Sequence, residues 1–150
     1  VWCLVMFFMM PYWHVYGKQN LSSETYRVKP DMFARATQEM VDKYTVRTET
    51  DRKIPVVQPP AGADVYLIAR LWDWWPILAL EKDKTYRLHL TAMDYQHGFS
   101  LQPDNINIQV LPGYEHVVTI TPNRAGTYAI VCNEFCGIGH HKMVSNLYVK

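Results

Sequence analysis

Residues 85–92 read TYRLHLTA, and polar and apolar side chains alternate along this stretch without a break. A period of two is typical of a β-strand with one face toward a core. Five further stretches have the composition of short strands, namely 65–71, 106–110, 116–121, 127–132 and 146–149. Because turn-forming residues separate them, we expect an all-β sandwich or barrel over residues 64–150.

The rest of the sequence excludes several function classes. Strands do not alternate with helical patterns, and GxGxxG, P-loop, HExxH and GxSxG motifs are absent, so nucleotide-binding α/β folds and the matching hydrolases are excluded. The 150 residues include 15 basic and 14 acidic ones, a formal net charge of +1. Such a balance creates no strong field, so a nucleic-acid partner is not expected.

The first thirteen residues, VWCLVMFFMMPYW, carry no charge. A membrane-spanning helix needs about 20 apolar residues, so residues 1–17 are interpreted as the C-terminal part of a membrane helix that begins upstream. Aromatic residues near its end, with Lys18 after them, match an interfacial belt and an exit into water. A signal-peptide remnant or a buried helix end are the alternatives.

Residues 18–63 are interpreted as a connector. Within it, apolar residues recur at spacings of three and four, which predicts a short amphipathic helix over 32–44 with Asp31 as its cap. We expect its apolar face to pack on a neighbouring subunit or domain. The proline-rich stretch 54–62, IPVVQPPAG, then leads into the β domain.

The chemistry is concentrated in residues 132–143, CNEFCGIGHHKM, which directly follow a predicted strand. This loop holds two cysteines, a histidine spaced four residues on and a methionine. His97, expected to begin another loop, supplies a second imidazole. Imidazole and soft sulfur ligands suit copper better than any hard cation.

Three other interpretations of this loop are possible. A disulfide between Cys132 and Cys136 leaves His140 and Met143 unexplained. A tetrahedral zinc site leaves Met143 idle, because zinc rarely binds a thioether. A mononuclear blue-copper site needs only one cysteine. Two thiolates are best used by two metal ions that share them, so the ligand count favours a binuclear copper centre.

The pattern C-x-E-x-C-G-x-x-H-x-x-M, with an upstream histidine in an Asp-x-x-His context, resembles the CuA domain of subunit II of haem-copper oxidases. The resemblance covers about residues 64–150. Residues 94–99, 105–108 and 110–113 are most similar to the compact B-type branch. The fold this implies is a cupredoxin, a Greek-key β-barrel, preceded by the end of a transmembrane helix and a short connecting helix.

The resemblance also implies a ligand set for a binuclear CuA centre. By position, the family's bridging thiolates, terminal imidazoles and weak ligands match, in that order, Cys132, Cys136, His97, His140, the Met143 sulfur and the backbone carbonyl of Glu134. No open coordination position is implied, so no residue is expected to be catalytic. The subunit would pass electrons to a partner.

Residues 70–76, RLWDWWP, hold three tryptophans in four positions. Family members carry an aromatic cluster in this region, where electrons enter from cytochrome c. Strand alternation would put Trp72 and Trp74 on one face, and we predict that one of them is the entry point. Ordinary packing is the alternative.

The function implied is the electron-accepting subunit of a respiratory terminal oxidase in the cell membrane. It would take electrons from cytochrome c, or another small redox protein, and deliver them to the haems of subunit I for dioxygen reduction. The copper domain would lie on the periplasmic or extracytoplasmic side. Alternatives are the corresponding subunit of a nitric oxide reductase and a copper carrier or assembly protein.

Overall fold

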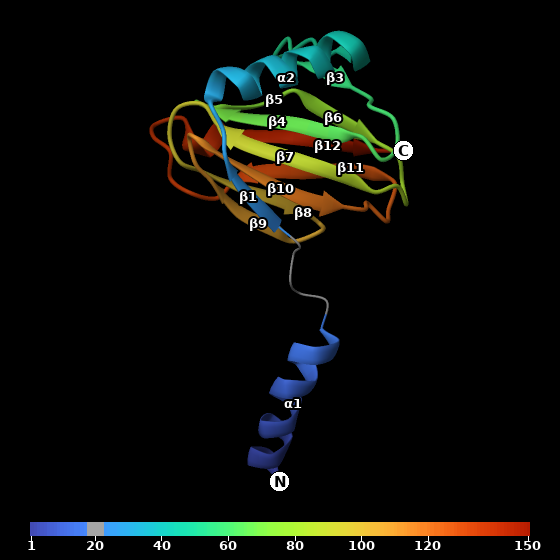
Figure 1. The fold of residues 1–150 in the computed structure, drawn as a ribbon, viewed down its shortest axis with the longest axis vertical. Coiled ribbons are helices and arrows are strands. Elements are labelled where there is room, and N and C mark those ends of the chain that lie inside the picture. The colour runs from blue at the N-terminus through green and yellow to red at the C-terminus, as the bar shows by residue number, and fades with distance from the viewer. Residues whose placement is uncertain (18–22) are drawn as a thin grey trace.

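Two β-sheets stack face to face in the computed structural model, which describes residues 1–17 and 23–150 (Figure 1). The five-stranded sheet has the order β1 (Ser23–Arg27), β10 (Tyr114–Ile120), β7 (Tyr86–Ala92), β4 (Asp64–Arg70) and β5 (Asp73–Trp75). The seven-stranded sheet has the order β2 (Thr45–Thr48), β3 (Pro55–Val57), β6 (Ile77–Leu80), β12 (Val144–Val149), β11 (Gly126–Cys132), β8 (His97–Gln102) and β9 (Ile106–Val110). The all-β prediction is confirmed, in the form of a sandwich of two sheets.

The alternating pattern of β7 explains how the core forms. Tyr86, Leu88, Leu90 and Ala92 are all buried and belong to the main apolar cluster between the sheets. The other five predicted strands are confirmed as β4, β9, β10, β11 and β12, with ends within two residues of those expected. The prediction that His97 begins a loop is wrong, because His97 is the first residue of β8.

The helix predicted over 32–44 is confirmed as α2 (Pro30–Tyr44). Asp31 does not cap it. Lys29 is the N-cap residue and Pro30 opens the first turn, where a missing N–H costs nothing. The apolar face of α2 contacts β4 of one sheet and β3 of the other, and Met40 and Val41 join the core cluster. This face therefore packs on the chain's own sandwich, to which residues 23–63 also contribute β1, β2 and β3.

Helix α1 (Trp2–Tyr16) buries none of its side chains. At 1.5 Å per residue it is about 22 Å long, whereas a bilayer core is about 30 Å thick. Over residues 1–17 and 23–150, no helix reaches the length and apolarity that a bilayer crossing requires. Lys18, the expected exit into water, lies outside the described residues.

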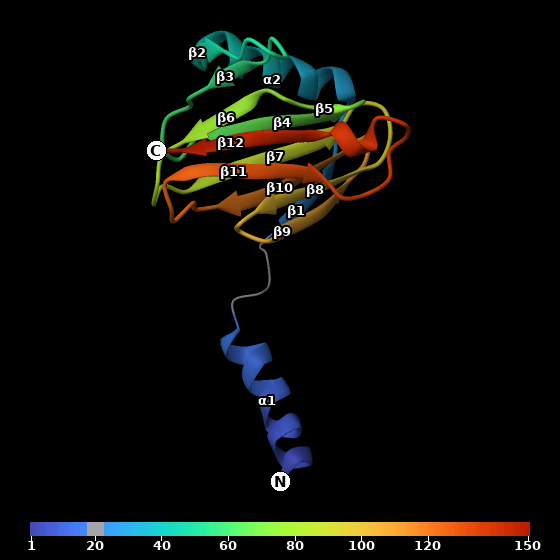
Figure 2. The ribbon, with the colours of Figure 1, turned by 180° about the vertical axis from the view of Figure 1, so that it is seen from behind.

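The loop between β11 and β12 and the loop between β7 and β8 lie at the same end of the sandwich (Figure 1 and Figure 2). The segment 132–143 carries five of the six predicted ligands, and the loop between β7 and β8 leads directly into the sixth, His97. The strands that hold them pair with one another, since β8 and β11 are antiparallel neighbours with Cys132 opposite Phe99. The fold thus brings His97 next to a loop that lies far away in the sequence.

Candidate metal centre

The loop 132–143 is closed at its base by the two strands that it joins. The N–H of Cys132 donates to the carbonyl of Met143 at 3.0 Å, and Val131 pairs with Val144 one step further down. The loop is therefore held by a rigid ladder, which keeps side chains at both of its ends in place.

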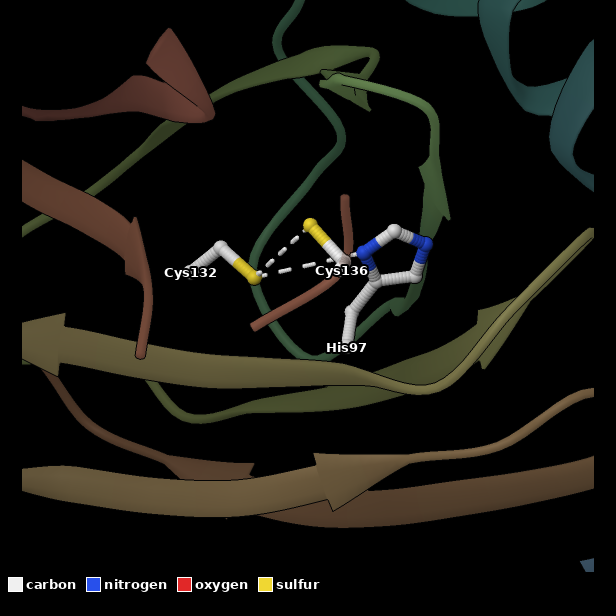
Figure 3. A group of neighbouring side chains, drawn as sticks. All are labelled: His97, Cys132 and Cys136. Carbon is white, nitrogen blue, oxygen red and sulfur yellow. Dashed lines mark hydrogen bonds between the residues drawn. The ribbon is translucent and has the colours of Figure 1, made fainter. Parts of the chain in front are cut away.

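Two cysteine sulfurs form the middle of the site (Figure 3). Cys132 Sγ and Cys136 Sγ lie 3.7 Å apart, and both thiols are free and buried. A disulfide needs a separation near 2.05 Å, so the sulfurs are not bonded to each other. The Nδ1 atom of His97 lies 3.9 Å from Cys132 Sγ, and His97, Cys132 and Cys136 place one ligand atom each within 4.8 Å of the others.

The other two side-chain donors face the second cysteine. Cys136 Sγ lies 3.7 Å from His140 Nδ1 and 3.7 Å from Met143 Sδ. His140 begins the 3₁₀ helix η1 (His140–Lys142), in which side chains three residues apart lie on the same side. The spacing H-x-x-M therefore turns both donors toward the same sulfur.

The backbone carbonyl of Glu134 completes the predicted set, and its oxygen lies 3.2 Å from Cys132 Sγ. Gly98 permits this approach. A Cβ at position 98 would lie 2.0 Å from the Asn133 side chain and 2.7 Å from the Glu134 nitrogen, both too close for any side chain. The Asn133 N–H donates to the Gly98 carbonyl at 3.1 Å, so the start of the loop rests directly on β8.

Asp94 orients the His97 ring. The Nε2 atom of His97 lies 2.7 Å from Asp94 Oδ1, which leaves Nδ1 directed toward the sulfurs. Desolvation alone would raise the pKa of Asp94, but hydrogen bonds from His97 and from the backbone N–H groups of Tyr95 and Leu71 outweigh it and lower that pKa below its ordinary value. The ionised carboxylate is an acceptor suited to a ligating histidine.

Cys136 is a thiol that resists ionisation. Desolvation, followed by the hydrogen bond with Cys132, raises the pKa of Cys136 from the ordinary 9.0 to about 11. A negative charge on one of two neighbouring buried sulfurs disfavours a negative charge on the other. Near neutral pH Cys136 is therefore a thiol in the metal-free chain, and a bound cation would favour its thiolate.

The donor chemistry of this site fits copper. It combines two cysteine sulfurs, two imidazole nitrogens, a thioether and one carbonyl, all brought together by β8 and the loop 132–143. Hard cations prefer oxygen ligands, and a structural zinc ion would leave donors unused. All six sequence-predicted ligand residues therefore lie at one place in the structure.

The two candidate tryptophans lie in different surroundings. Trp74, in β5, is fully buried and packs edge-to-face on His97 and Phe99. Trp72 precedes β5 and is 40% exposed. Its indole covers Gly139, where an added Cβ would lie only 2.2 Å from the ring. Strand alternation therefore does not relate the two residues, and Trp72 is the one at the surface.

A group of exposed apolar side chains surrounds Trp72, and we call it the apolar rim. It lines a hollow of about 630 Å³ beside Cys136 and consists of Leu71, Trp72, Tyr95, Phe135 and Ile138. Phe135 and Ile138 are 81% and 89% exposed. Tyr95, Ile138 and the role of Asp94 do not follow from the sequence patterns described above. All three lie within three residues of a predicted ligand in the sequence, and this proximity is the signal that could have identified them.

The comparisons with known proteins agree with this geometry. The family model described as cytochrome c oxidase subunit II, periplasmic domain, matches residues 70–148. Cytochrome c oxidase subunit 2 of Thermus thermophilus is 37% identical over 117 residues, which cover 75% of this chain and 87% of that protein. A chain of a solved haem-copper terminal oxidase dimer has a TM-score of 0.61 at 20% identity and covers 99% of this chain and 92% of its own length. Rusticyanin from Thiobacillus ferrooxidans, at a TM-score of 0.50 and 16% identity, covers 87% of this chain and 99% of its own length, and supports a cupredoxin-like fold.

Proposed function

Because the chain belongs to the cytochrome c oxidase subunit II family, whose members transfer electrons to subunit I through a copper domain, we propose that its site holds two copper ions bridged by Cys132 and Cys136. Electrons enter from cytochrome c or another small redox protein. They leave to the haems of subunit I, where dioxygen is reduced. The observation that carries this proposal is that each of two neighbouring sulfurs has its own imidazole and its own weak donor.

The two sets of donors argue for two ions rather than one. Cys132 lies beside the His97 nitrogen and the Glu134 carbonyl, and Cys136 lies beside the His140 nitrogen and the Met143 sulfur. A single ion would leave one set idle. Two ions that share both sulfurs use all six donors and match the positive charge to the two thiolates.

The protein holds these donor atoms in a fixed geometry and shields them from water. A bound copper pair supplies one-electron redox chemistry. Trp74 packs on His97 and on Phe99, and Met143 is fully buried. The side of the site that faces the protein core is therefore closed to water. The β-ladder at the base of the loop and the hydrogen bond that His97 Nε2 donates to Asp94 hold the ligands in one geometry. A rigid site of this kind changes little when an electron arrives or leaves.

The apolar rim is proposed as the surface on which the donor docks. It exposes aromatic and aliphatic groups directly over the metal loop, and exposed apolar clusters of this kind mark interaction sites. Trp72 at its centre touches the backbone of Gly139, one residue before the ligand His140. The contact gives an electron a short route from a docked protein to the site.

Residues 1–17 are proposed as the end of a membrane helix that keeps the copper domain at the outer face of the cell membrane. The fifteen residues of α1 include no Asp, Glu, Lys or Arg, and none of their side chains is buried by protein. A lipid environment would cover this apolar surface. Residues 18–63 would then link the membrane segment to the copper domain of residues 64–150, while adding strands to it.

The electron-entry assignment is tested in the complex purified from its native membrane. In Trp72→Phe, electron transfer from the donor should slow by about tenfold or more while the copper spectrum stays unchanged, because the surface contact is lost and the ligands are not. Trp75→Phe, in the same motif, is the matched control. An unchanged rate in Trp72→Phe would refute the assignment.

The terminal acceptor is tested with the same preparation. Consumption of dioxygen at a rate that far exceeds consumption of nitric oxide is expected. Rapid reduction of nitric oxide without dioxygen consumption would favour the alternative enzyme. A chain that is isolated without haem-bearing partners, and whose copper exchanges readily, would instead indicate a copper carrier.

A further inference from the structure

Asp94 uses its two carboxylate oxygens on two different parts of the site. Oδ1 accepts from His97 Nε2 at 2.7 Å and from the Tyr95 N–H at 2.7 Å. Oδ2 accepts from the backbone N–H of Leu71 at 2.6 Å. Leu71 belongs to the turn between β4 and β5, and His97 begins β8 in the other sheet. One side chain therefore bridges the two sheets at the metal end of the sandwich.

The turn held by Asp94 is the one that carries Trp72. Leu71 immediately precedes Trp72, whose indole lies flat over Gly139, and its edge also reaches the space over Gly137. Trp72 is thus located from two sides, by the metal loop beneath it and by the bonded Leu71 amide next to it. The same carboxylate that holds the Leu71 amide also sets the orientation of the ligand His97.

Only a carboxylate can satisfy both groups. The Leu71 N–H and the His97 Nε2–H are both donors, and an ionised carboxylate offers an acceptor on each of its oxygens. An asparagine at position 94 has one acceptor and one donor. Its NH₂ group would have to face either the Leu71 N–H or the His97 N–H, so one of the two bonds is necessarily lost.

We propose that Asp94 is a positioning residue that holds the ligand His97 and the Trp72 turn as one hydrogen-bonded unit, so that the entry tryptophan keeps a constant place over the metal loop. The proposal rests on the proposed function, because it gives Trp72 the role of electron entry. The coupling of His97 to the Trp72 turn through Asp94 can be tested separately from electron transfer.

The test compares Asp94→Asn, Asp94→Glu and the control Asp104→Asn in the full chain. Asp104 is a half-buried acid in the turn after β8, at the opposite end of that strand. Two measurements need no metal: hydrogen exchange of the Leu71 amide, and the ¹⁹F resonance of Trp72 in fluorotryptophan-labelled protein, assigned with Trp72→Phe. Copper affinity of each variant is the third measurement.

In Asp94→Asn we expect faster exchange at Leu71, a shifted Trp72 resonance, and copper affinity lower by about 10- to 100-fold, as is usual when the partner of a ligating histidine is lost. Asp94→Glu keeps two acceptor oxygens, so its Leu71 exchange, Trp72 resonance and copper affinity should lie between those of the unmodified chain and Asp94→Asn. Asp104→Asn should leave all three measurements unchanged. In the complete complex, Asp94→Asn should lower the maximal rate of electron entry more than the donor's KM.

Two results would overturn the proposal. If Asp94→Asn weakens copper binding while Leu71 and Trp72 are unaffected, Asp94 serves His97 alone. If no measurement changes, Asp94 positions neither group. A failure of Trp72→Phe to slow electron entry would refute the proposed entry point instead, and it would leave the metal-free measurements on Leu71 and Trp72 as an independent result.

Discussion

Two buried histidines, His97 and His89, both bond to carboxylates, yet their surroundings give them different roles. His97 uses one ring nitrogen on Asp94 and turns the other toward two sulfurs. His89, in β7, has a carboxylate at each nitrogen, Glu115 at Nδ1 and Asp64 at Nε2 with a separation of 3.2 Å. Both ring nitrogens of His89 are therefore occupied by partners within the protein, and the residue ties β7 to its neighbours β10 and β4.

The difference shows that burial and a carboxylate partner do not make a histidine a ligand. What distinguishes His97 is a single carboxylate, which fixes the tautomer, together with soft donors on the opposite side of the ring. The two residues also differ in what they connect. His97 joins a metal loop to a strand, whereas His89 joins three strands of one sheet.

The largest effect should come from removing a shared sulfur. Cys136→Ser deletes the donor that faces both His140 and Met143, so we expect at most one copper ion per chain and loss of the colour of the binuclear site. Copper content and the visible spectrum check this. Full loading with an unchanged spectrum would show that Cys136 is not a bridging ligand.

The comparison of the two histidines predicts opposite phenotypes for their alanine variants. His97→Ala should lose more than about a hundredfold in copper affinity, because a direct ligand matters more than an outer partner. His89→Ala should leave the copper spectrum intact and lower the free energy of unfolding by about 1–3 kcal/mol, since Glu115 and Asp64 lose their common partner. Copper titration and chemical denaturation measure the two effects. A copper defect in His89→Ala would break the distinction.

Copper uptake should depend steeply on pH. Binding converts two thiols to thiolates, and desolvation and the neighbour Cys132 raise the pKa of Cys136 to about 11. Copper affinity should therefore fall by about tenfold for each unit by which the pH is lowered, for each proton released on binding. The variant Cys136→Ser, with one thiol fewer, should show a shallower slope. Equal slopes in the two proteins would contradict the release of a proton from Cys136.

The same raised pKa gives the metal-free chain a stability change of defined sign. Below about pH 9 the thiol is protonated in both the folded and unfolded states. As pH rises from 9.0 through about 11, the unfolded chain ionises first, so the contribution of Cys136 to folding stability is progressively lost. Denaturation midpoints of the metal-free chain at several alkaline pH values check this, and Cys136→Ser should lack that part of the decline.

The smallest expected effect concerns Asp64, the more exposed of the two carboxylates that bond to His89. Asp64 is about half exposed, and it contacts both His89 and Arg87. Ion pairs at exposed positions contribute about 0–1 kcal/mol, so Asp64→Asn should lower stability by no more than about 1 kcal/mol and should leave copper binding unchanged. Thermal denaturation resolves such a difference. A loss as large as that of His89→Ala would mean that Asp64, rather than Glu115, is the main partner.

The sequence predicts strands well where side chains alternate or where strand-forming residues lie between turn signals, and it misses strands that show neither pattern. The strand β7 follows from TYRLHLTA. By contrast, β6 is the continuous apolar run ILAL, buried at every position, and β1 is an exposed edge strand, SETYR, so neither shows a period of two. A strand with only one face toward a core exposes its other face to water, but His89 on the outward face of β7 is only 8% exposed, because carboxylates from neighbouring strands and the Tyr66 ring cover it.

The ligand set could be predicted because five of its six members lie within one run of twelve residues. The difference between Trp72 and Trp74 could not, since it depends on how a turn packs on Gly139. Nor does the sequence show that Phe135 is 81% exposed while its ring packs edge-to-face on the ligand His140. The second bond of Asp94, to the Leu71 amide, joins two sheets and leaves no local pattern in the chain.

The central claim is that two sulfurs 3.7 Å apart hold two copper ions that share them. Electron paramagnetic resonance of the copper-loaded chain, with copper content measured on the same sample, tests it most directly. We expect two ions per chain and a seven-line hyperfine pattern, which one electron spread equally over two copper nuclei produces. One ion per chain with a four-line pattern, or no bound copper with the two sulfurs oxidised to a disulfide, would contradict the account.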